Sequence, residues 1–214
     1  MIFVEALQGS EAWLQARVGK ITASCFADAI SVTQRASGKR KAGDPTAASD
    51  RYAADLAIER ISGKPHGEPI KSWVLERGHE MEMHARMIYE ARTSAFVTES
   101  GICVDDDGIF GYSSDGLVND DGLIEIKSPI DSSKIMEMWR TGDTSEYDHQ
   151  IYGGMWLTGR QYCDFIMYVP DLAAVGKDLF VKRILRDDDF IDSMVRDLAK
   201  FNDRVNFNVS LLRK

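Results

Sequence analysis

The sequence predicts a mixed α/β domain in which a central mixed β-sheet is flanked by helices. Segments with the apolar spacing of helices are interleaved with short runs rich in β-branched and aromatic residues, an order that favours a sheet covered by helices. A second observation is a tight turn signal, Asn119-Asp-Asp-Gly122, between two apolar runs. The 214 residues can bury a sizeable core, and we expect a single domain over residues 1–214.

Three helices are expected in the first half of the chain. The first opens at an N-cap supplied by Thr22 or Ser24, because short hydroxyl side chains accept hydrogen bonds from the first turn of a helix. The second begins at Asp50, its expected N-cap, and continues to Ile61 with apolar residues on one stripe. The third is longer and covers about residues 73–92.

A polar and basic stretch at about residues 33–50 separates the first two helices. It combines Gly, Ser and Pro with the cations Arg35, Lys39, Arg40 and Lys41, which predicts a loop or arm. Two interpretations are open: a solvated loop, and an arm that contacts the phosphates of a nucleic acid.

The second half of the chain combines strands and helices. We expect, in order, a strand at 95–104, a hairpin of 108–118 and 123–127, helices at 132–141 and 145–158, strands at 162–169 and 178–185, and a last helix at about 187–205. The last helix opens with three consecutive aspartates, which suit the positive end of the helix dipole.

Composition narrows the class of protein. The chain is 44% hydrophobic and 28% charged, as in globular proteins, and we expect neither a membrane span nor a signal peptide. Three widely spaced cysteines without a Cys-x-x-Cys pattern argue against a zinc site and favour a reducing cytoplasm. A net charge of −8 argues against a basic protein that coats DNA, although a local basic surface remains compatible with it.

The most informative pattern is Asp115 with Glu125 and Lys127 in the predicted hairpin. Because side chains alternate across a strand, Glu125 and Lys127 share one face while Ile124 and Ile126 point to the buried one. The turn can bring Asp115 beside Glu125. Two carboxylates and a backbone carbonyl suit Mg²⁺ or Mn²⁺, and a nearby lysine can orient or help deprotonate a water, as hydrolysis of a phosphodiester requires. The alternative is a solvated strand face with an ordinary ion pair.

A third carboxylate, Glu82, lies at the edge of an apolar stripe in the helix at 73–92. From there it can reach a metal held on the adjacent sheet. Equally compatible with the sequence is a pair with Arg86 one helical turn away. The spacing of His79 and His84 does not place them on one helix face, so we do not expect them to bind zinc.

Four segments, in order, carry a family resemblance: WLQARVGKITAS at 13–24, ERGHEMEMHARMIYE at 76–90, YSSDGLV to GLIEIKSP at 112–129, and YDHQIYGGMWLTG at 147–159. They resemble the lambda-type phage exonucleases, the alkaline exonucleases of viral recombination systems, within the PD-(D/E)XK superfamily. One position departs from the superfamily pattern, because Ser114 stands where a proline precedes the aspartate. Proline is not a ligand, so this departure concerns the local turn and not the chemistry.

The resemblance implies a restriction-endonuclease-like core and a set of metal-site residues. Asp115 and Glu125 would bind Mg²⁺ together with the Ile126 carbonyl, with Mn²⁺ as an accepted substitute. Lys127 would act on the attacking water, and Glu82 would be a further acidic ligand.

The resemblance also implies a set of DNA-contacting residues. Arg17 and Ser24 match residues that hold the 5′-phosphate end, Arg35 corresponds to another phosphate-binding arginine, and Gln150 is the family glutamine near the active site. For Arg17 and Ser24, an ion pair at the edge of the core and a helix cap remain as alternatives.

The activity implied by the resemblance is processive 5′→3′ degradation of one strand of linear double-stranded DNA, which leaves a 3′ single strand for an annealing recombinase. It further implies a ring-shaped homotrimer around the DNA, whose basic channel and acidic exterior would reconcile DNA binding with the negative charge, and a phage or prophage protein acting in the bacterial cytoplasm. Two alternatives are an endonuclease of the same superfamily and a non-catalytic module that binds DNA ends. A small-molecule enzyme is disfavoured, because the sequence has no Gly-rich dinucleotide or phosphate-binding motif.

Overall fold

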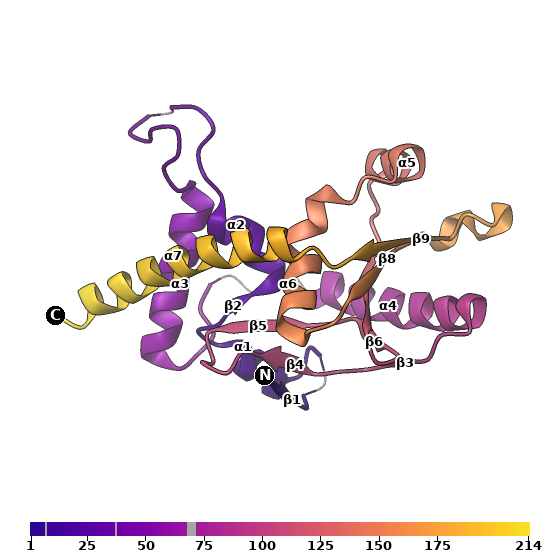
Figure 1. Cartoon of the computed structure of the whole chain (residues 1–214), viewed down its shortest axis with the longest axis horizontal. Helices are drawn as coiled ribbons and strands as arrows, with labels where there is room; N and C mark the ends of the chain where they lie inside the picture. Colours follow the sequence, from indigo (N-terminus) through magenta and orange to yellow (C-terminus); the bar gives the residue numbers. More distant parts are fainter. Residues whose placement is uncertain (7, 37, 68–71) are drawn as a thin grey trace.

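The computed structural model of the chain describes residues 1–6, 8–36, 38–67 and 72–214, and side chains 72–75 are also left undescribed (Figure 1). Its elements in chain order are β1 (Ile2–Val4), α1 (Glu11–Arg17), β2 (Ile21–Thr22), the 3₁₀ turn η1 (Ala23–Cys25), α2 (Phe26–Ile30), α3 (Ala47–Ser62), α4 (Ser72–Thr93), β3 (Val97–Thr98), β4 (Ile102–Val104), β5 (Phe110–Ser113), β6 (Gly116–Val118), β7 (Gly122–Lys127), α5 (Ser132–Thr141), η2 (Ser145–Tyr147), α6 (Asp148–Thr158), β8 (Tyr162–Tyr168), η3 (Pro170–Val175), β9 (Leu179–Leu185) and α7 (Asp188–Leu212).

The strands form two mixed sheets, so the prediction of one central sheet is wrong while the mixed α/β class is confirmed. A four-stranded sheet has the order β1-β4-β5-β2 and a five-stranded sheet the order β3-β6-β7-β8-β9. The β2–β5 and β7–β8 pairs are parallel and the remaining pairs are antiparallel. The two predicted strands at 95–104 and 108–118 are each divided, and their halves join different sheets.

Glycines explain where these two predicted strands divide. Gly101 lies against the Val4 carbonyl of β1, so closely that a Cβ atom at this position would overlap it. At Gly116 a Cβ atom would overlap the Val97 side chain. Such close approaches are open only to glycine, and they let each segment bend from one sheet into the other.

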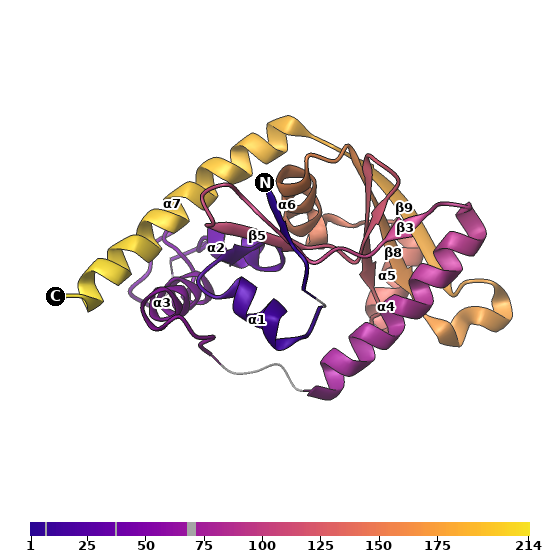
Figure 2. The same cartoon turned by 90° about the horizontal axis from the view of Figure 1, so that it is seen from below.

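Helices cover both faces of the five-stranded sheet. The α4 helix packs on β7, β8 and β9 from one side, and α6 packs on β7 and β8 from the other, where it also contacts α7 and the four-stranded sheet. Figure 2 shows α4 and α7 on opposite sides of the strands. Two apolar clusters result, one containing Leu123 and Phe165 and the other containing Ile124, Ile126 and Ile166. The central strands β7 and β8 are therefore buried on both faces.

Several helix ends differ from the sequence expectation. Thr46, and not Asp50, caps α3, because its hydroxyl accepts a hydrogen bond from the Ser49 amide (3.1 Å). Neither candidate cap opens a regular helix near residue 22, where the 3₁₀ turn η1 leads into the short α2. At the other end of the chain, Asp187 caps α7 as its acidic sequence predicts, and this helix continues to Leu212.

The basic stretch at 33–50 is an extended loop up to the start of α3, and it projects beyond α2 and α3 (Figure 1). Residue 37 of this arm lies outside the described residues. Backbone hydrogen bonds join Thr33 with Gly43 and Asp44 at its base. Arg40 donates to the Pro45 carbonyl (3.0 Å), which holds the returning half of the loop. The described residues of this stretch before α3 thus lie in a loop, and its contact with phosphates stays a prediction.

A buried polar cluster ties α4 to the five-stranded sheet. Asp164 of β8, 3% exposed, accepts two hydrogen bonds from the Arg183 guanidinium of β9 (both 2.8 Å) and one from the Tyr89 hydroxyl of α4 (2.6 Å). Because α4 also carries Glu82, this cluster fixes where that carboxylate lies relative to the sheet.

We expect the Asp164→Ala variant to lose about 1–3 kcal/mol of unfolding free energy, because the buried Tyr89 hydroxyl is left without its acceptor. The Arg183 side chain is 53% exposed, so water can replace its lost partner and the loss stays below that of a fully buried ion pair. Urea unfolding measures the difference. The matched control is Asp197→Ala, which breaks a surface pair with Lys200 and should cost less than about 0.5 kcal/mol. Equal losses in the two variants would contradict the structural role of Asp164.

Candidate active site

The predicted hairpin is confirmed and brings the first two carboxylates together. Gly116 of β6 pairs with Ile124 of β7, so Asp115 lies beside Glu125 at the start of the hairpin. The amide of Ile126 donates a hydrogen bond to Asp115 Oδ2 (2.6 Å), which fixes the aspartate against β7. The connecting turn places Asn119 at a φ of 47°, in the left-handed region that asparagine tolerates better than most residues.

Glu125 is the hub of a hydrogen-bond network. Its Oε1 accepts from Lys127 Nζ (2.8 Å) and from Gln150 Nε2 on α6 (2.5 Å), and its Oε2 accepts from the Tyr112 hydroxyl on β5 (3.2 Å). Lys127 Nζ also donates to Gln150 Oε1 (3.1 Å). Because Glu125 is only 1% exposed, the alternative of a solvated strand face is wrong.

Burial and mutual repulsion shape the charges of this cluster. Burial, followed by the negative charges of Glu125 and Glu82, raises the pKa of Asp115 well above its ordinary value. Burial is also the main cause of a raised pKa for Glu82, partly opposed by His79. Burial alone would lower the pKa of Lys127, but the carboxylates of Glu125 and Asp115 outweigh it and the net shift is upward. A lysine in this charge state orients water or neutralises a phosphate and does not accept a proton.

One cavity of about 210 Å³ gathers almost all the residues that the sequence singled out. It is lined by Arg17, Ser24, Glu82, Asp115, Glu125, Ile126, Lys127 and Gln150, together with Gln8, Trp13, Ala23, Tyr112 and Ser113. Arg35 is the one predicted residue that is not among them, since it lies exposed in the arm.

Arg17 enters the cavity from the end of α1 with a supported side chain. Its guanidinium lies over the Trp13 ring, 4.4 Å from the centroid, and donates to Thr22 Oγ1 (3.2 Å). Trp13 is itself anchored, because its indole N–H donates to Ser113 Oγ (2.8 Å). Among the described residues Arg17 forms no ion pair, so the alternative of an ion pair at the edge of the core is not observed. Its charge is therefore available to an anion in the cavity.

Ser24 lies exposed in η1, next to Thr22. Its Oγ is 3.4 Å from Thr22 Oγ1, the same oxygen that accepts from Arg17. It does not cap α2, whose N-cap position is Cys25 and shows no side-chain hydrogen bond. The helix-cap alternative for Ser24 is therefore not observed either.

The carboxylates also border more open space. A hollow of about 690 Å³ between the N-terminal strand and α4 includes Glu82 and Asp115 in its wall. Another, of about 330 Å³, includes Glu82 and Ile126 and continues towards Pro129. Glu82 therefore lies where three hollows meet, and a long substrate has room on both sides of the acidic cluster.

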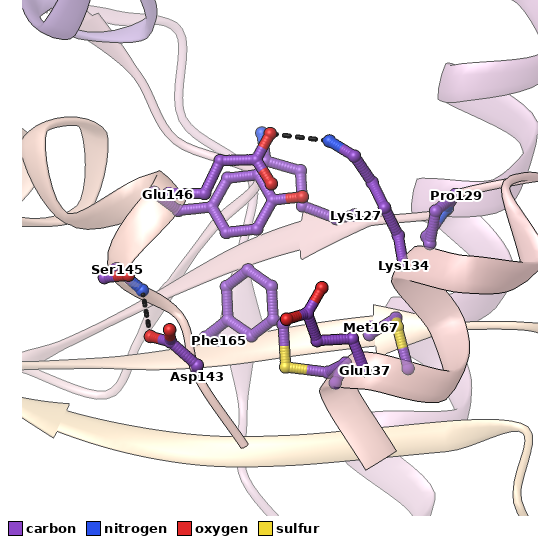
Figure 3. A pocket seen from close by; sticks show the side chains of 11 residues that line it. Lys127, Pro129, Lys134, Glu137, Asp143, Ser145, Glu146, Phe165 and Met167 are labelled. Carbon is purple, nitrogen blue, oxygen red and sulfur yellow. Dashed lines mark hydrogen bonds and ion pairs between the residues drawn. The ribbon is translucent and has the colours of Figure 1, made fainter. Parts of the chain in front are cut away.

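A further cavity of about 200 Å³ adjoins Lys127 on its other side (Figure 3). The Lys134–Glu146 ion pair (2.6 Å) spans it, and Phe165 lies against the Tyr147 ring with 5.0 Å between the ring centroids. Lys127 Nζ lies 5.5 Å from the centroid of the same Tyr147 ring. The stacked rings of Tyr147 and Phe165 thus support Lys127 on the side of this neighbouring cavity.

The donor atoms of this cluster fit a small hard cation. Within the ranges that the structure describes, no three acidic, histidine or cysteine side chains are already arranged as a cation site. Mg²⁺ does not require one, because it commonly binds through one or two carboxylates and takes its other ligands from water and substrate phosphates. Asp115 and Glu125, with the Ile126 carbonyl, provide such a partial set. Burial, followed by the negative charges of Glu125 and Glu82, raises the pKa of Asp115, and a cation would relieve the repulsion between these carboxylates.

Five residues of the cavity were not among the predicted site residues: Gln8, Trp13, Ala23, Tyr112 and Ser113. Of these, Tyr112 contacts Glu125 and Trp13 contacts Arg17. Tyr112 faces inward from β5 and reaches Glu125 across a tertiary contact, so only the need of a buried hydroxyl for a partner could have pointed to it. Trp13 supports Arg17 from four residues away, a spacing that places two side chains on one helix face. That signal depends on α1, and no helix was predicted from the sequence at these residues.

Fold and cluster together define a nuclease-like α/β protein, with two carboxylates and a lysine on one buried hairpin. The chain belongs to the YqaJ-like viral recombinase family, whose model matches residues 12–161. This match confirms the resemblance to viral recombination proteins. No curated protein matches the chain.

Solved structures agree with this family. An alkaline exonuclease, LHK-Exo, from Laribacter hongkongensis is 35% identical, with 95% of this chain and 96% of that chain covered and a TM-score of 0.78. The same protein in complex with dAMP gives 34% identity over the same shares and a TM-score of 0.82. A phage-related exonuclease from Haemophilus somnus 129PT shares the fold, with 16% identity, 90% and 96% coverage and a TM-score of 0.68.

Proposed function

We propose that this chain is a Mg²⁺-dependent 5′→3′ exonuclease that degrades one strand of linear double-stranded DNA and leaves a 3′ single strand. The observation that carries the proposal is the cavity itself. It joins the hydrolytic cluster of Asp115, Glu125 and Lys127 to an arginine, Arg17, that has no carboxylate partner among the described residues. The similarity to an alkaline exonuclease over nearly the whole chain supports the same activity.

The residues of the cluster have distinct roles in this proposal. Asp115 and Glu125, with the Ile126 carbonyl and with Glu82 as a further ligand, hold Mg²⁺, for which Mn²⁺ can substitute. The bound ion supplies Lewis acidity and neutralises charge on the phosphate. Lys127, held between Glu125 and Gln150, orients the attacking water through its ammonium group.

The reaction leaves a 5′-phosphate behind at each step. Water adds to the phosphorus between the first two nucleotides, the bond to the 3′ oxygen of the first nucleotide breaks, and that oxygen takes up a proton. The shortened strand then begins with a new 5′-phosphate, which Arg17 and Ser24 are placed to bind. The complex of LHK-Exo with dAMP, a nucleoside monophosphate of the kind released, supports this product.

Wider features of the proposal depend on the family resemblance. Three copies form a ring around the duplex, the exposed Arg35 of the arm contacts phosphates, and a single-strand annealing recombinase receives the 3′ strand. The protein acts in the cytoplasm of a bacterial host as a phage or prophage product. No helix in the described ranges is long and apolar enough to cross a membrane.

A comparison of four DNAs tests the reaction class. The protein is incubated with Mg²⁺, with and without EDTA, and with linear duplex carrying a 5′-phosphate, linear duplex with a 5′-hydroxyl, closed circular duplex, or single strand. We expect the 5′-phosphorylated duplex to release mononucleotides with Mg²⁺ but not when EDTA chelates the metal. The closed circular duplex should remain intact. Cutting of the circle would instead indicate an endonuclease, and binding without hydrolysis would indicate a non-catalytic module for DNA ends.

The Arg17→Ala variant should lose about 10- to 100-fold in rate on 5′-phosphorylated ends, because a hydrogen bond to a charged group contributes about 1.5–3 kcal/mol. On 5′-hydroxyl ends the loss should be much smaller. Initial rates on the two substrates measure the effect.

Two comparisons sharpen this result. Arg17→Lys keeps the charge and loses the two-pronged geometry, so it should fall between wild type and Arg17→Ala. Arg140→Ala removes an exposed cation of α5 and should leave the rates unchanged. If Arg17→Ala slows both kinds of end equally, Arg17 does not read the phosphate.

A further inference from the structure

Tyr112 lies behind the acidic cluster, fully enclosed by protein. It belongs to β5, in the four-stranded sheet, whereas Glu125 lies on β7 of the five-stranded sheet. The tyrosine is 2% exposed, and its hydroxyl reaches Glu125 Oε2 at 3.2 Å. This contact is a direct polar link from one sheet to the catalytic hairpin of the other.

The hydroxyl completes the donor set around Glu125. Lys127 and Gln150 both donate to Oε1, and Tyr112 donates to Oε2. A carboxylate held by donors on both oxygens has one orientation, whereas donors on Oε1 alone leave rotation about its last torsion open. Tyr112 also lines the cavity, so its position affects the shape of the site.

The sequence of α6 makes room for this tyrosine. A Cβ atom at Gly154 would lie 2.6 Å from Cζ of the Tyr112 ring. Glycine inside a helix costs about 1 kcal/mol relative to alanine, so helix formation does not favour it here. The neighbouring Gly153 makes room in the same way for Phe26, a core residue that does not line the cavity.

We propose that Tyr112 is a positioning residue that fixes the Glu125 carboxylate for cation binding, and that Gly154 keeps its ring in place. The inference rests on the proposed function, because it assigns Glu125 to the cation. Partners that orient a metal ligand typically change metal affinity or activity by about 10- to 100-fold when they are removed.

The test compares Tyr112→Phe with Tyr89→Phe. Both changes remove one buried tyrosine hydroxyl that donates to a carboxylate, but Tyr89 donates to Asp164, away from the cavity. Mn²⁺ binding is measured by electron paramagnetic resonance without DNA, and kcat and KM are measured on 5′-phosphorylated duplex. We expect Tyr112→Phe to weaken Mn²⁺ binding or lower kcat by about 10-fold or more, with KM for DNA unchanged. Tyr89→Phe should keep the wild-type Kd for Mn²⁺ while losing thermal stability.

Gly154→Ala provides a second variant that leaves the hydroxyl in place. It should shift the Tyr112 ring and lower Mn²⁺ affinity or kcat in the same direction, whereas Gly153→Ala should lower stability without changing the Kd. A combined Tyr112→Phe and Gly154→Ala variant should be no worse than its stronger parent, because both changes act on one contact. If Tyr112→Phe does not fold, as judged by circular dichroism, Gly154→Ala and Gly153→Ala test the role of Tyr112 instead. The proposal then requires that only Gly154→Ala changes the Kd for Mn²⁺ or kcat.

The outcomes separate this inference from the proposed function. Wild-type Mn²⁺ affinity and kcat in Tyr112→Phe, or equal effects of the two glycine variants on the Kd, would overturn the role of Tyr112. If the wild-type protein neither binds Mn²⁺ nor hydrolyses DNA, the proposed function fails, and the role of Tyr112 fails with it.

Discussion

Replacement of Glu125 by glutamine is expected to lower hydrolysis by at least about 10³-fold while duplex binding in Ca²⁺ stays close to wild type. The metal contributes several kcal/mol of charge stabilisation in reactions of this class, and each 1.36 kcal/mol corresponds to a factor of ten in rate. The glutamine keeps the shape of the side chain but has a single acceptor oxygen, which can accept either from Tyr112 or from Lys127 and Gln150. The loss therefore combines the removed charge at the metal site with one changed hydrogen-bond partner. Single-turnover rates and fluorescence anisotropy on one 5′-phosphorylated duplex measure the two quantities.

The matched control for this variant is Glu137→Gln. Glu137 lines the cavity on the other side of Lys127 but not the one that contains Asp115 and Glu125 (Figure 3). We expect its rate to stay at the wild-type level. A Glu125→Gln protein with substantial activity would contradict the metal-site assignment, and a general loss of DNA binding would point to misfolding of the hairpin.

Replacement of Lys127 by methionine should lower hydrolysis by about 10²–10³-fold, the usual effect of removing one aligned donor from a reacting oxygen. The two variants should differ in their affinity for Mn²⁺, because Glu125→Gln removes a proposed ligand and should weaken Mn²⁺ binding. Lys127 is not a ligand, and its positive charge lies 2.8 Å from Glu125, so its removal should leave Mn²⁺ affinity unchanged or increase it. Mn²⁺ titrations of the two variants, alongside their rates, distinguish a ligand from a residue that acts on the water.

Lys134→Met is the control for the lysine. It removes an exposed ammonium that pairs with Glu146 across the neighbouring cavity, and we expect no change in the rate of hydrolysis. If Lys127→Met lowers Mn²⁺ affinity as strongly as Glu125→Gln does, the separate role of the lysine would be wrong.

The hairpin could be predicted because its information is local. The turn residues, the alternating residues of β7, Asp115 and Glu125 all lie within one short segment of the sequence. The geometry of an antiparallel hairpin then places Asp115 beside Glu125. Burial of Ile124 and Ile126 followed from the same alternation. Burial of Glu125 on the opposite face did not, because it depends on α6 and β5 arriving from elsewhere in the chain.

The division into two sheets could not be predicted from the sequence pattern. The segments at 95–104 and 108–118 each have enough β-forming residues for one strand, and the bends at Gly101 and Gly116 arise from contacts with Val4 and Val97. The Tyr112–Glu125 contact is likewise tertiary. For Arg35, the family resemblance predicted a role in phosphate binding that the structure of one chain does not test. Arg35 lies exposed in the arm and does not line the cavity.

The direction of degradation tests most directly whether this protein is a 5′→3′ exonuclease. A linear duplex carries 5′-phosphates, with one strand labelled at its 5′ nucleotide and, in a second preparation, at its 3′ nucleotide. With Mg²⁺, we expect the 5′ label to appear first as a mononucleotide, while the 3′ label stays on strands that shorten with time. Early release of the 3′ label, or internal fragments that keep the 5′ label, would contradict an exonuclease that starts from the 5′-phosphate held by Arg17.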